Sequence, residues 1–124
     1  MSPKEPVVLD SESVEIEKVD RGEGVFIQRL IVAEEGAKNC FMRRFTIKPG
    51  GSMPLHQHDK TDHVQYVLEG KMKVILGEET HLAKKGNSLY IPAGLKHSYE
   101  NPFEVDVVFI CVVPAGDIKT EIME

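Results

Sequence analysis

The chain has 124 residues, of which 41% are hydrophobic and 28% are charged, a composition typical of a folded globular protein and not of a disordered one. This length suits one hydrophobic core, so we expect a single domain over residues 1–124. The formal net charge is −5 and no basic cluster stands out, which excludes nucleic acid as an expected partner.

Short runs rich in Val, Ile, Phe, Tyr and Thr recur along the chain and are separated by Gly, Pro, Asn and Asp. In chain order they predict strands at residues 14–19, 25–32, 40–47, 64–68, 71–76, 80–83, 88–91, 97–100 and 105–113. The turn-forming residues 48–51 predict a break after the third strand. Gly77 and Glu78 predict a two-residue hairpin, because glycine supplies the positive φ that such turns need. This spacing indicates an all-β sandwich or barrel with its core at about 14–113 and an extended arm at each end.

The ends and the apolar stretches do not predict a membrane protein. The first ten residues, MSPKEPVVLD, lack the apolar region of a signal peptide. The longest apolar stretch, Val105 to Val113, is too short to cross a bilayer. Cys40 and Cys111 stand in apolar runs and are typical of reduced core thiols, with a disulfide as the alternative. We therefore expect a cytoplasmic protein.

The last predicted strand is apolar on both faces. One face carries Val105, Val107, Phe109 and Cys111, and the other carries Val108, Ile110 and Val112. Because an antiparallel sheet usually leaves one face to water, the second apolar face indicates that something covers it. Either the N-terminal strands or a second copy of the chain can do so, and we expect a homodimer.

Three of the five histidines lie close together in the stretch from residue 50 to residue 70. Residues two apart in a strand share a face, so His56 and His58 should project together. Residues 59–62 are polar and turn-like. We expect a hairpin there that brings His63 opposite the other two rings.

A fourth histidine, His97, follows the turn at residues 92–94, whereas His81 has polar neighbours and is expected on the surface. Neutral imidazole is a common ligand of transition metals. We therefore predict that His56, His58, His63 and His97 bind one divalent transition-metal ion. The ligands do not select among Mn, Fe, Zn, Ni, Co and Cu. Because the rings must be neutral, we expect metal loss as the pH falls through about 6.

The residues around these histidines resemble the two motifs of the cupin superfamily. The first motif is G-x5-H-x-H-x(3,4)-E-x6-G, and it is matched by Gly50, His56, His58 and Gly70. His63 stands where the family usually has glutamate. The second motif, G-x5-P-x-G-x2-H-x3-N, is matched throughout by Gly86, Pro92, Gly94, His97 and Asn101. The resemblance implies a single jelly-roll barrel, similar to the small single-domain cupins that have a four-histidine site.

The resemblance says less about the reaction, because cupins include dioxygenases, isomerases, decarboxylases, sensor domains and storage proteins. We expect a small mononuclear-metal oxidoreductase that carries out dioxygenase-like oxidative cleavage of a small organic substrate. The alternatives are a metal-dependent isomerase or decarboxylase, and a non-catalytic protein that binds a metal or a small molecule.

Further polar residues share strand faces with the predicted ligands. Gln65 follows His63 on its face, and Tyr99 follows His97 on its face. Each is a candidate to hydrogen-bond a substrate or to orient a ligand, and each is equally compatible with a satisfied core position. Arg43 and Arg44 lie on opposite faces of one strand, so one of them points inward. An inward Arg43 would favour an anionic substrate; the alternative is a salt bridge at the barrel mouth or at an interface.

Overall fold

Antiparallel strands make up most of the regular structure in the computed structural model, which describes residues 5–58, 61–115 and 120–122, with backbone alone at 58 and 120–122. In chain order the strands are β1 (Glu17–Lys18), β2 (Glu23–Ile31), β3 (Cys40–His58), β4 (His63–Glu69), β5 (Lys71–Leu76), β6 (Glu79–Lys84), β7 (Ser88–Ile91), β8 (His97–Glu100), β9 (Val107–Pro114) and β10 (Thr120–Ile122). The 3-10 turns η1 (Ser11–Ser13) and η2 (Ala33–Glu35) flank β1 and β2. No helix among the described residues has the length and apolar character needed to span a bilayer.

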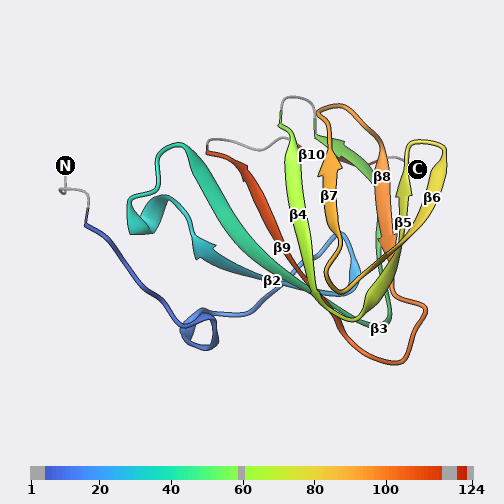
Figure 1. The fold of residues 1–124 in the computed structure, drawn as a ribbon, viewed down its shortest axis with the longest axis horizontal. Coiled ribbons are helices and arrows are strands. Elements are labelled where there is room, and N and C mark those ends of the chain that lie inside the picture. The colour runs from blue at the N-terminus through green and yellow to red at the C-terminus, as the bar shows by residue number, and fades with distance from the viewer. Residues whose placement is uncertain (1–4, 59–60, 116–119, 123–124) are drawn as a thin grey trace.

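The strands form one coiled sheet with the order β6-β5-β8-β3-β9-β4-β7, while β1, β2 and β10 attach at its side through β2 and β3. The sheet curls into a nearly closed barrel, which confirms the predicted all-β barrel (Figure 1). Alternation sets the inner face: in β4, every second side chain from His63 to Val67 is buried. Gly77 has φ 63° in the two-residue turn between β5 and β6, as predicted.

Strand β3 connects the two halves of the barrel. It runs from Cys40 to His58 without interruption, so the predicted break at residues 48–51 is wrong. Its first part pairs with β9 and its later part pairs with β8. Gly51 makes this course possible, because a Cβ atom there would lie 2.7 Å from the backbone oxygen of Glu23. Glycine therefore lets β3 bend while it remains paired with β2.

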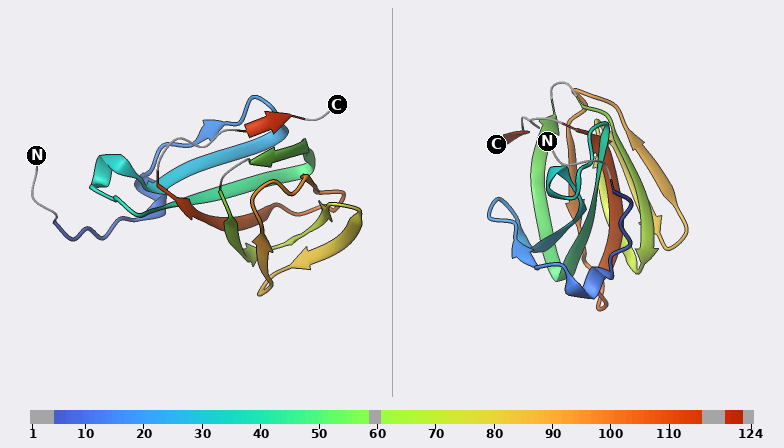
Figure 2. Two further views of the ribbon diagram at one scale, coloured as in Figure 1. Left: turned by 90° about the horizontal axis from the view of Figure 1, so that it is seen from above. Right: turned by 90° about the vertical axis from the view of Figure 1, so that its left-hand side faces the viewer.

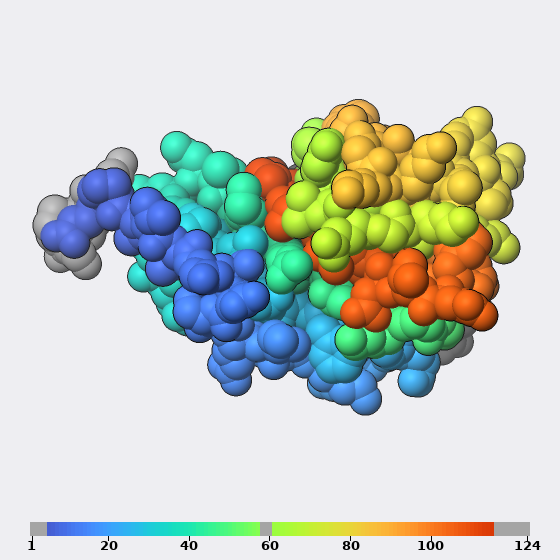
Figure 3. Space-filling model, turned by 60° about the horizontal axis from the view of Figure 1, so that its bottom comes forward, coloured from blue at the N-terminus to red at the C-terminus, as the bar shows by residue number. Residues whose placement is uncertain are grey.

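The two ends of the chain differ from the predicted arms and strands. Regular strand structure at the predicted strand 14–19 is limited to β1. The preceding segment lies along one side of the molecule (Figure 3), where the Gln28 side chain donates to the backbone oxygens of Ser11 and Val14 at 2.7 and 3.2 Å. At the other end β10 pairs with the end of β3, so residues 120–122 form a strand and not an arm (Figure 2).

Aromatic rings link the core to the interior of the barrel. Phe109, on β9, is 1% exposed and stacks on Phe45 with ring centroids 5.2 Å apart. Tyr99, on β8, stacks on Phe109 as well, with ring centroids 5.4 Å apart. The three rings form a continuous wall that begins in the core and ends beside the histidines.

The outer face of the same sheet carries an apolar row. The strand register places Met42, Val112, Val64 and Tyr90 side by side across β3, β9, β4 and β7. Val64 and Tyr90 are 53% and 60% exposed. The N-terminal segment packs on Gln28, which pairs with Arg44 on this same outer face, so the segment lies over β2 beside the row. We call these four residues the outer row.

Candidate functional site

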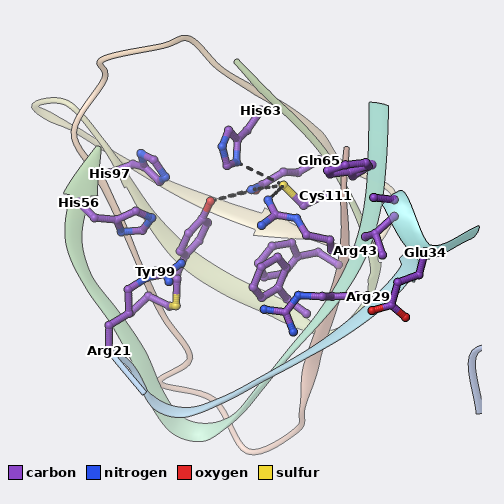
Figure 4. A pocket seen from close by; sticks show the side chains of 16 residues that line it. Arg21, Arg29, Glu34, Arg43, His56, His63, Gln65, His97, Tyr99 and Cys111 are labelled. Atoms are coloured by element: carbon purple, nitrogen blue, oxygen red, sulfur yellow. Dashed lines mark hydrogen bonds between the residues drawn. The ribbon is translucent and has the colours of Figure 1, made fainter. Parts of the chain in front are cut away.

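A cavity of about 420 Å³ lies inside the barrel, a size that suits a small organic ligand (Figure 4). Three of the predicted ligands, His56, His63 and His97, line it. Gln65 and Tyr99 also line it, as their strand faces predict. The side chain of His58 lies outside the described part of the chain.

His56 and His97 are opposite one another across the β3–β8 pair. Their ring centroids are 4.1 Å apart, and both side chains are 1% exposed. Nδ1 of His56 is 2.7 Å from the carbonyl oxygen of Pro54, and Nδ1 of His97 is 2.9 Å from that of Leu95. A carbonyl can only accept, so each Nδ1 carries the proton. Each ring therefore keeps its lone pair on Nε2.

A β-bulge in β3 brings His56 to the inside of the barrel. Met53 pairs with Tyr99 and His56 pairs with His97, so β3 has one residue more than β8 between the two pairs. In a regular strand two residues three apart, such as Met53 and His56, would point to opposite faces, and the bulge lets both face the cavity. Pro54 fits here because a bulge tolerates a residue without an N–H.

His63 reaches the cavity by a route that differs from the predicted hairpin. Its strand, β4, pairs with β7 and β9, so the prediction that β4 returns beside β3 is wrong. Asp62 instead joins the two loops, because its Oδ1 accepts from the Ala93 N–H at 2.8 Å. This bond ties the approach to His63 to the turn before His97, and the two rings have centroids 6.3 Å apart.

Cys111 supports His63 from inside the barrel. Its Sγ is 3.3 Å from Nδ1 of His63, while Thr61 Oγ1 is 3.5 Å from Nε2 of that ring. The sulfur also accepts from Gln65 Nε2 and from Arg43 Nη2, each at 3.4 Å. Cys111 is completely buried, so these contacts take place away from water. Cys111 is a core thiol, as predicted, whereas Cys40 is exposed, so the prediction of a core position for Cys40 is wrong.

Three histidines thus share the cavity, but a four-histidine metal site is not established. Among the residues with described side chains, no group of three or more His, Cys, Asp or Glu has the arrangement needed to hold a metal ion. The fourth predicted ligand, His58, is not among them. The joint role of the four rings therefore stays a prediction.

Burial controls the protonation of two residues in the cavity. It lowers the pKa of His97, an effect that Arg21 reinforces and the Leu95 carbonyl opposes. The neutral ring, which is the form that binds metals, is favoured. Burial, and then Cys111, raise the pKa of the Tyr99 phenol, so it stays a neutral hydrogen-bond donor. Gln65 Nε2 donates to its oxygen at 2.8 Å.

Arginines also line the cavity. Arg43 points inward, with its guanidinium carbon 5.3 Å from the centroid of the Phe45 ring. Arg44 lies on the opposite face, where it donates to Gln28 at 3.4 Å. Arg21 joins Arg43 from the turn before β2, and its pKa is lowered by burial and then by Arg43. The sequence did not identify Arg21 as a cavity residue, because it lies in a turn, where the sequence pattern does not predict which way a side chain points.

Comparison with known proteins is consistent with this architecture. A family model described as "Cupin domain" matches residues 43–113. The polyketide cyclase RemF from Streptomyces resistomycificus has 25% identity and a TM-score of 0.87, over 97% of this chain and 88% of that one. A predicted oxalate decarboxylase from Thermotoga maritima has 25% identity and a TM-score of 0.79, over 89% and 100%.

Similarity to curated proteins covers smaller parts. Mannose-1-phosphate guanylyltransferase 2 of Escherichia coli O157:H7 is 35% identical over 80 residues, which are 64% of this chain. The matched region is 16% of that enzyme. The likeness is therefore to one part of a much longer protein.

Proposed function

We propose a metal-dependent function for this chain, which belongs to the cupin family because the cupin-domain model matches more than half of its residues. One divalent transition-metal ion would be held by His56, His58, His63 and His97. The observation that carries this proposal is the shared anchoring of the described rings. His56 and His97 are each held at Nδ1 by a carbonyl, and His63 is held at Nδ1 by a sulfur. A ring that is protonated at Nδ1 coordinates through Nε2, and at His63 the ion would replace the contact of Nε2 with Thr61 Oγ1.

The spacing of the rings is compatible with one shared ion. Imidazole nitrogens bind such ions at about 2 Å, so two rings on opposite sides of an ion have centroids roughly 6.5 Å apart. The separations of 4.1 Å between His56 and His97 and 6.3 Å between His63 and His97 lie within that limit. The donors are all imidazoles, which suit Zn, Cu, Fe and Ni, so the ion's identity stays open.

We propose a Lewis-acid enzyme acting on an oxygen-bearing organic substrate, of the isomerase or decarboxylase kind. Similarity to a polyketide cyclase over nearly the whole chain, and to a predicted oxalate decarboxylase, supports a non-oxidative reaction. A bound divalent ion would stabilise negative charge on a substrate oxygen. The Tyr99 hydroxyl donates to Gln65 Oε1 at 3.1 Å, and we propose that it would donate to such a substrate oxygen in place of that bond.

The second candidate is the oxidoreductase that the sequence predicts, with dioxygenase-like cleavage. Four protein ligands on a six-coordinate ion leave two positions for dioxygen and a substrate. Oxygen uptake by Fe- or Mn-loaded protein, measured with catechols, diketones and styrenes, separates the two candidates. Oxygen uptake that begins when one of these substrates is added would favour the oxidoreductase. Conversion of β-keto acids in the absence of oxygen would favour the Lewis acid, and binding without turnover would indicate a non-catalytic binder.

Cys111→Ala is expected to weaken metal binding by about 10- to 100-fold, because His63 loses the partner of its Nδ1. The measurement is competitive titration of the purified protein with a metal-chelating dye. Cys40→Ala is the matched control, since Cys40 is an exposed thiol at the start of β3. Equal affinities in the two variants would show that the sulfur does not position the ring.

We propose that a second copy of the chain covers the outer row. The row is apolar and continuous across four strands, and patches of this kind mark contacts between proteins. Val64→Glu is expected to convert a dimer into a monomer in sedimentation at micromolar concentration, because it places a charge in the middle of the row. Leu82→Glu, on β6 and 54% exposed, is the control and should leave the mass unchanged. A monomeric wild-type protein would contradict the proposal.

A further inference from the structure

Two guanidinium groups share the cavity with the histidines. Arg21 comes from the turn before β2 and Arg43 comes from β3, and both side chains line the cavity (Figure 4). The Nε atoms of both are buried, and the described residues supply no hydrogen-bond partner for either atom. Within the same described part of the chain, neither arginine forms an ion pair.

The other charged groups of the cavity do not neutralise this pair. Arg29 also lines the cavity but is engaged by Glu17. Glu34 lines it on the side of η2, where its side chain is exposed to solvent. The cavity therefore keeps an excess of positive charge in its buried part.

Such a pair of cations indicates a binding site for an anion. A partly buried charge without a partner is costly, and two like charges that face each other add repulsion. A metal ion bound by imidazoles would bring further positive charge, since none of the four predicted ligands is a carboxylate. A ligand with negative charge would relieve all of these costs at once. Guanidinium groups bind carboxylates through two parallel hydrogen bonds.

The walls of the cavity indicate the nature of that anion. Phe45 and Phe109 both line it and stack nearly parallel, with an angle of 15° between their planes. Phe41 lines the same side of β3. The faces of these two rings already pack on each other, on the Arg43 guanidinium and on Tyr99. A ligand would therefore contact apolar ring edges, which suit an apolar organic body better than a bare inorganic phosphate.

We propose that the substrate is an organic carboxylate with an apolar body, whose carboxylate is bound by Arg21 and Arg43. The body lies along the wall formed by Phe45 and Phe109, and its other end faces the histidines. This assignment names the substrate class of the proposed function and uses the same cavity. The arginines act without the metal, so the two proposals can fail separately.

The test is calorimetric titration of the metal-free protein with trans-cinnamate and with its neutral amide, which has nearly the same shape. Cinnamate is expected to bind at least about tenfold more tightly, as a charge-assisted hydrogen bond predicts. Arg43→Gln and Arg21→Gln should each lower cinnamate affinity about tenfold and leave amide binding unchanged. Equal binding of acid and amide to the wild-type protein would overturn the proposal, and so would tighter binding of inorganic phosphate than of cinnamate.

Arg44→Gln is the matched control, because Arg44 is the next residue on the same strand and faces outward. It should bind cinnamate like the wild-type protein, and an equal loss of affinity in Arg44→Gln and Arg43→Gln would overturn the proposal.

Without ligand, Arg43→Gln should unfold at the same temperature as the wild-type protein or at a higher one, because the substitution relieves repulsion. A lower unfolding temperature would indicate a structural role for Arg43 and overturn the proposal. Arg21→Gln provides the same comparison from a different element. Metal titration of Arg43→Gln, expected at one ion per chain, separates failure of the metal site from failure of the anion site.

Discussion

His97→Ala is expected to reduce metal content from about one ion per chain to almost none. The ring lies opposite His56, is held at Nδ1 by the Leu95 carbonyl, and is neutral because burial lowers its pKa. Loss of a mere supporting partner weakens metal binding 10- to 100-fold, so loss of the ligand should cost more than about 100-fold. Metal analysis of protein purified without an affinity tag gives the content, and circular dichroism checks that the variant is folded.

The control for this variant is His81→Ala. His81 lies on β6, is exposed, contacts Glu79 at 3.0 Å, and is not among the residues that line the cavity. Its removal should leave the metal content unchanged. Full metal content in His97→Ala, or equal loss in both variants, would show that the ion is not bound by the cavity histidines.

Gly70→Ala is expected to destabilise the protein by about 3 kcal/mol or more. Gly70 joins β4 to β5 with φ 75°, and a Cβ atom there would lie 2.3 Å from the backbone oxygen of Asp106. A left-handed conformation alone costs an alanine about 1–2 kcal/mol. The collision with backbone adds to this cost, because the segment before β9 must move. Urea unfolding of the two proteins measures the difference.

Gly86→Ala separates the two contributions. Gly86 has φ 90°, but a Cβ atom there meets nothing within 4 Å. It should therefore cost only about 1–2 kcal/mol. If Gly70→Ala costs no more than Gly86→Ala, the close approach to Asp106 does not contribute to stability.

The sequence predicts those parts of the fold that depend on neighbours in the chain. Strands 71–76, 88–91 and 97–100 lie where the apolar runs place them, because side-chain alternation and turn residues are local signals. Side-chain alternation also shows that either Arg43 or Arg44 must point inward, but it does not show which of the two. Asn101, a motif residue, has one local contact, because its Nδ2 donates to the backbone oxygen of Val105 in the turn after β8. The same group also donates to the backbone oxygen of Ile47 on β3, a long-range contact.

Features that depend on long-range pairing could not be predicted. His56 meets His97 through β3 and β8, whereas the sequence suggested the nearer partner β4. Turn residues between two successive strands favour a hairpin. They do not predict that the chain passes from β3 to a strand, β4, that pairs elsewhere in the sheet. Arg21 reaches the cavity for the same kind of reason. Its turn is brought there by the pairing of β2 with β3, which no local pattern reports.

The continuous course of β3 has a consequence for substrate length. Arg43 and His56 stand on one unbroken strand and face one cavity, although thirteen positions separate them. The distance between the residue that would bind an acid group and the residue that would hold the ion is thus set within one continuous strand, including its bend at Gly51 and its bulge after Met53. Because both residues lie on the same strand, no movement between separate elements is needed to set this distance. A substrate that is too short would bind Arg43 through its carboxylate without placing its other end near the histidines.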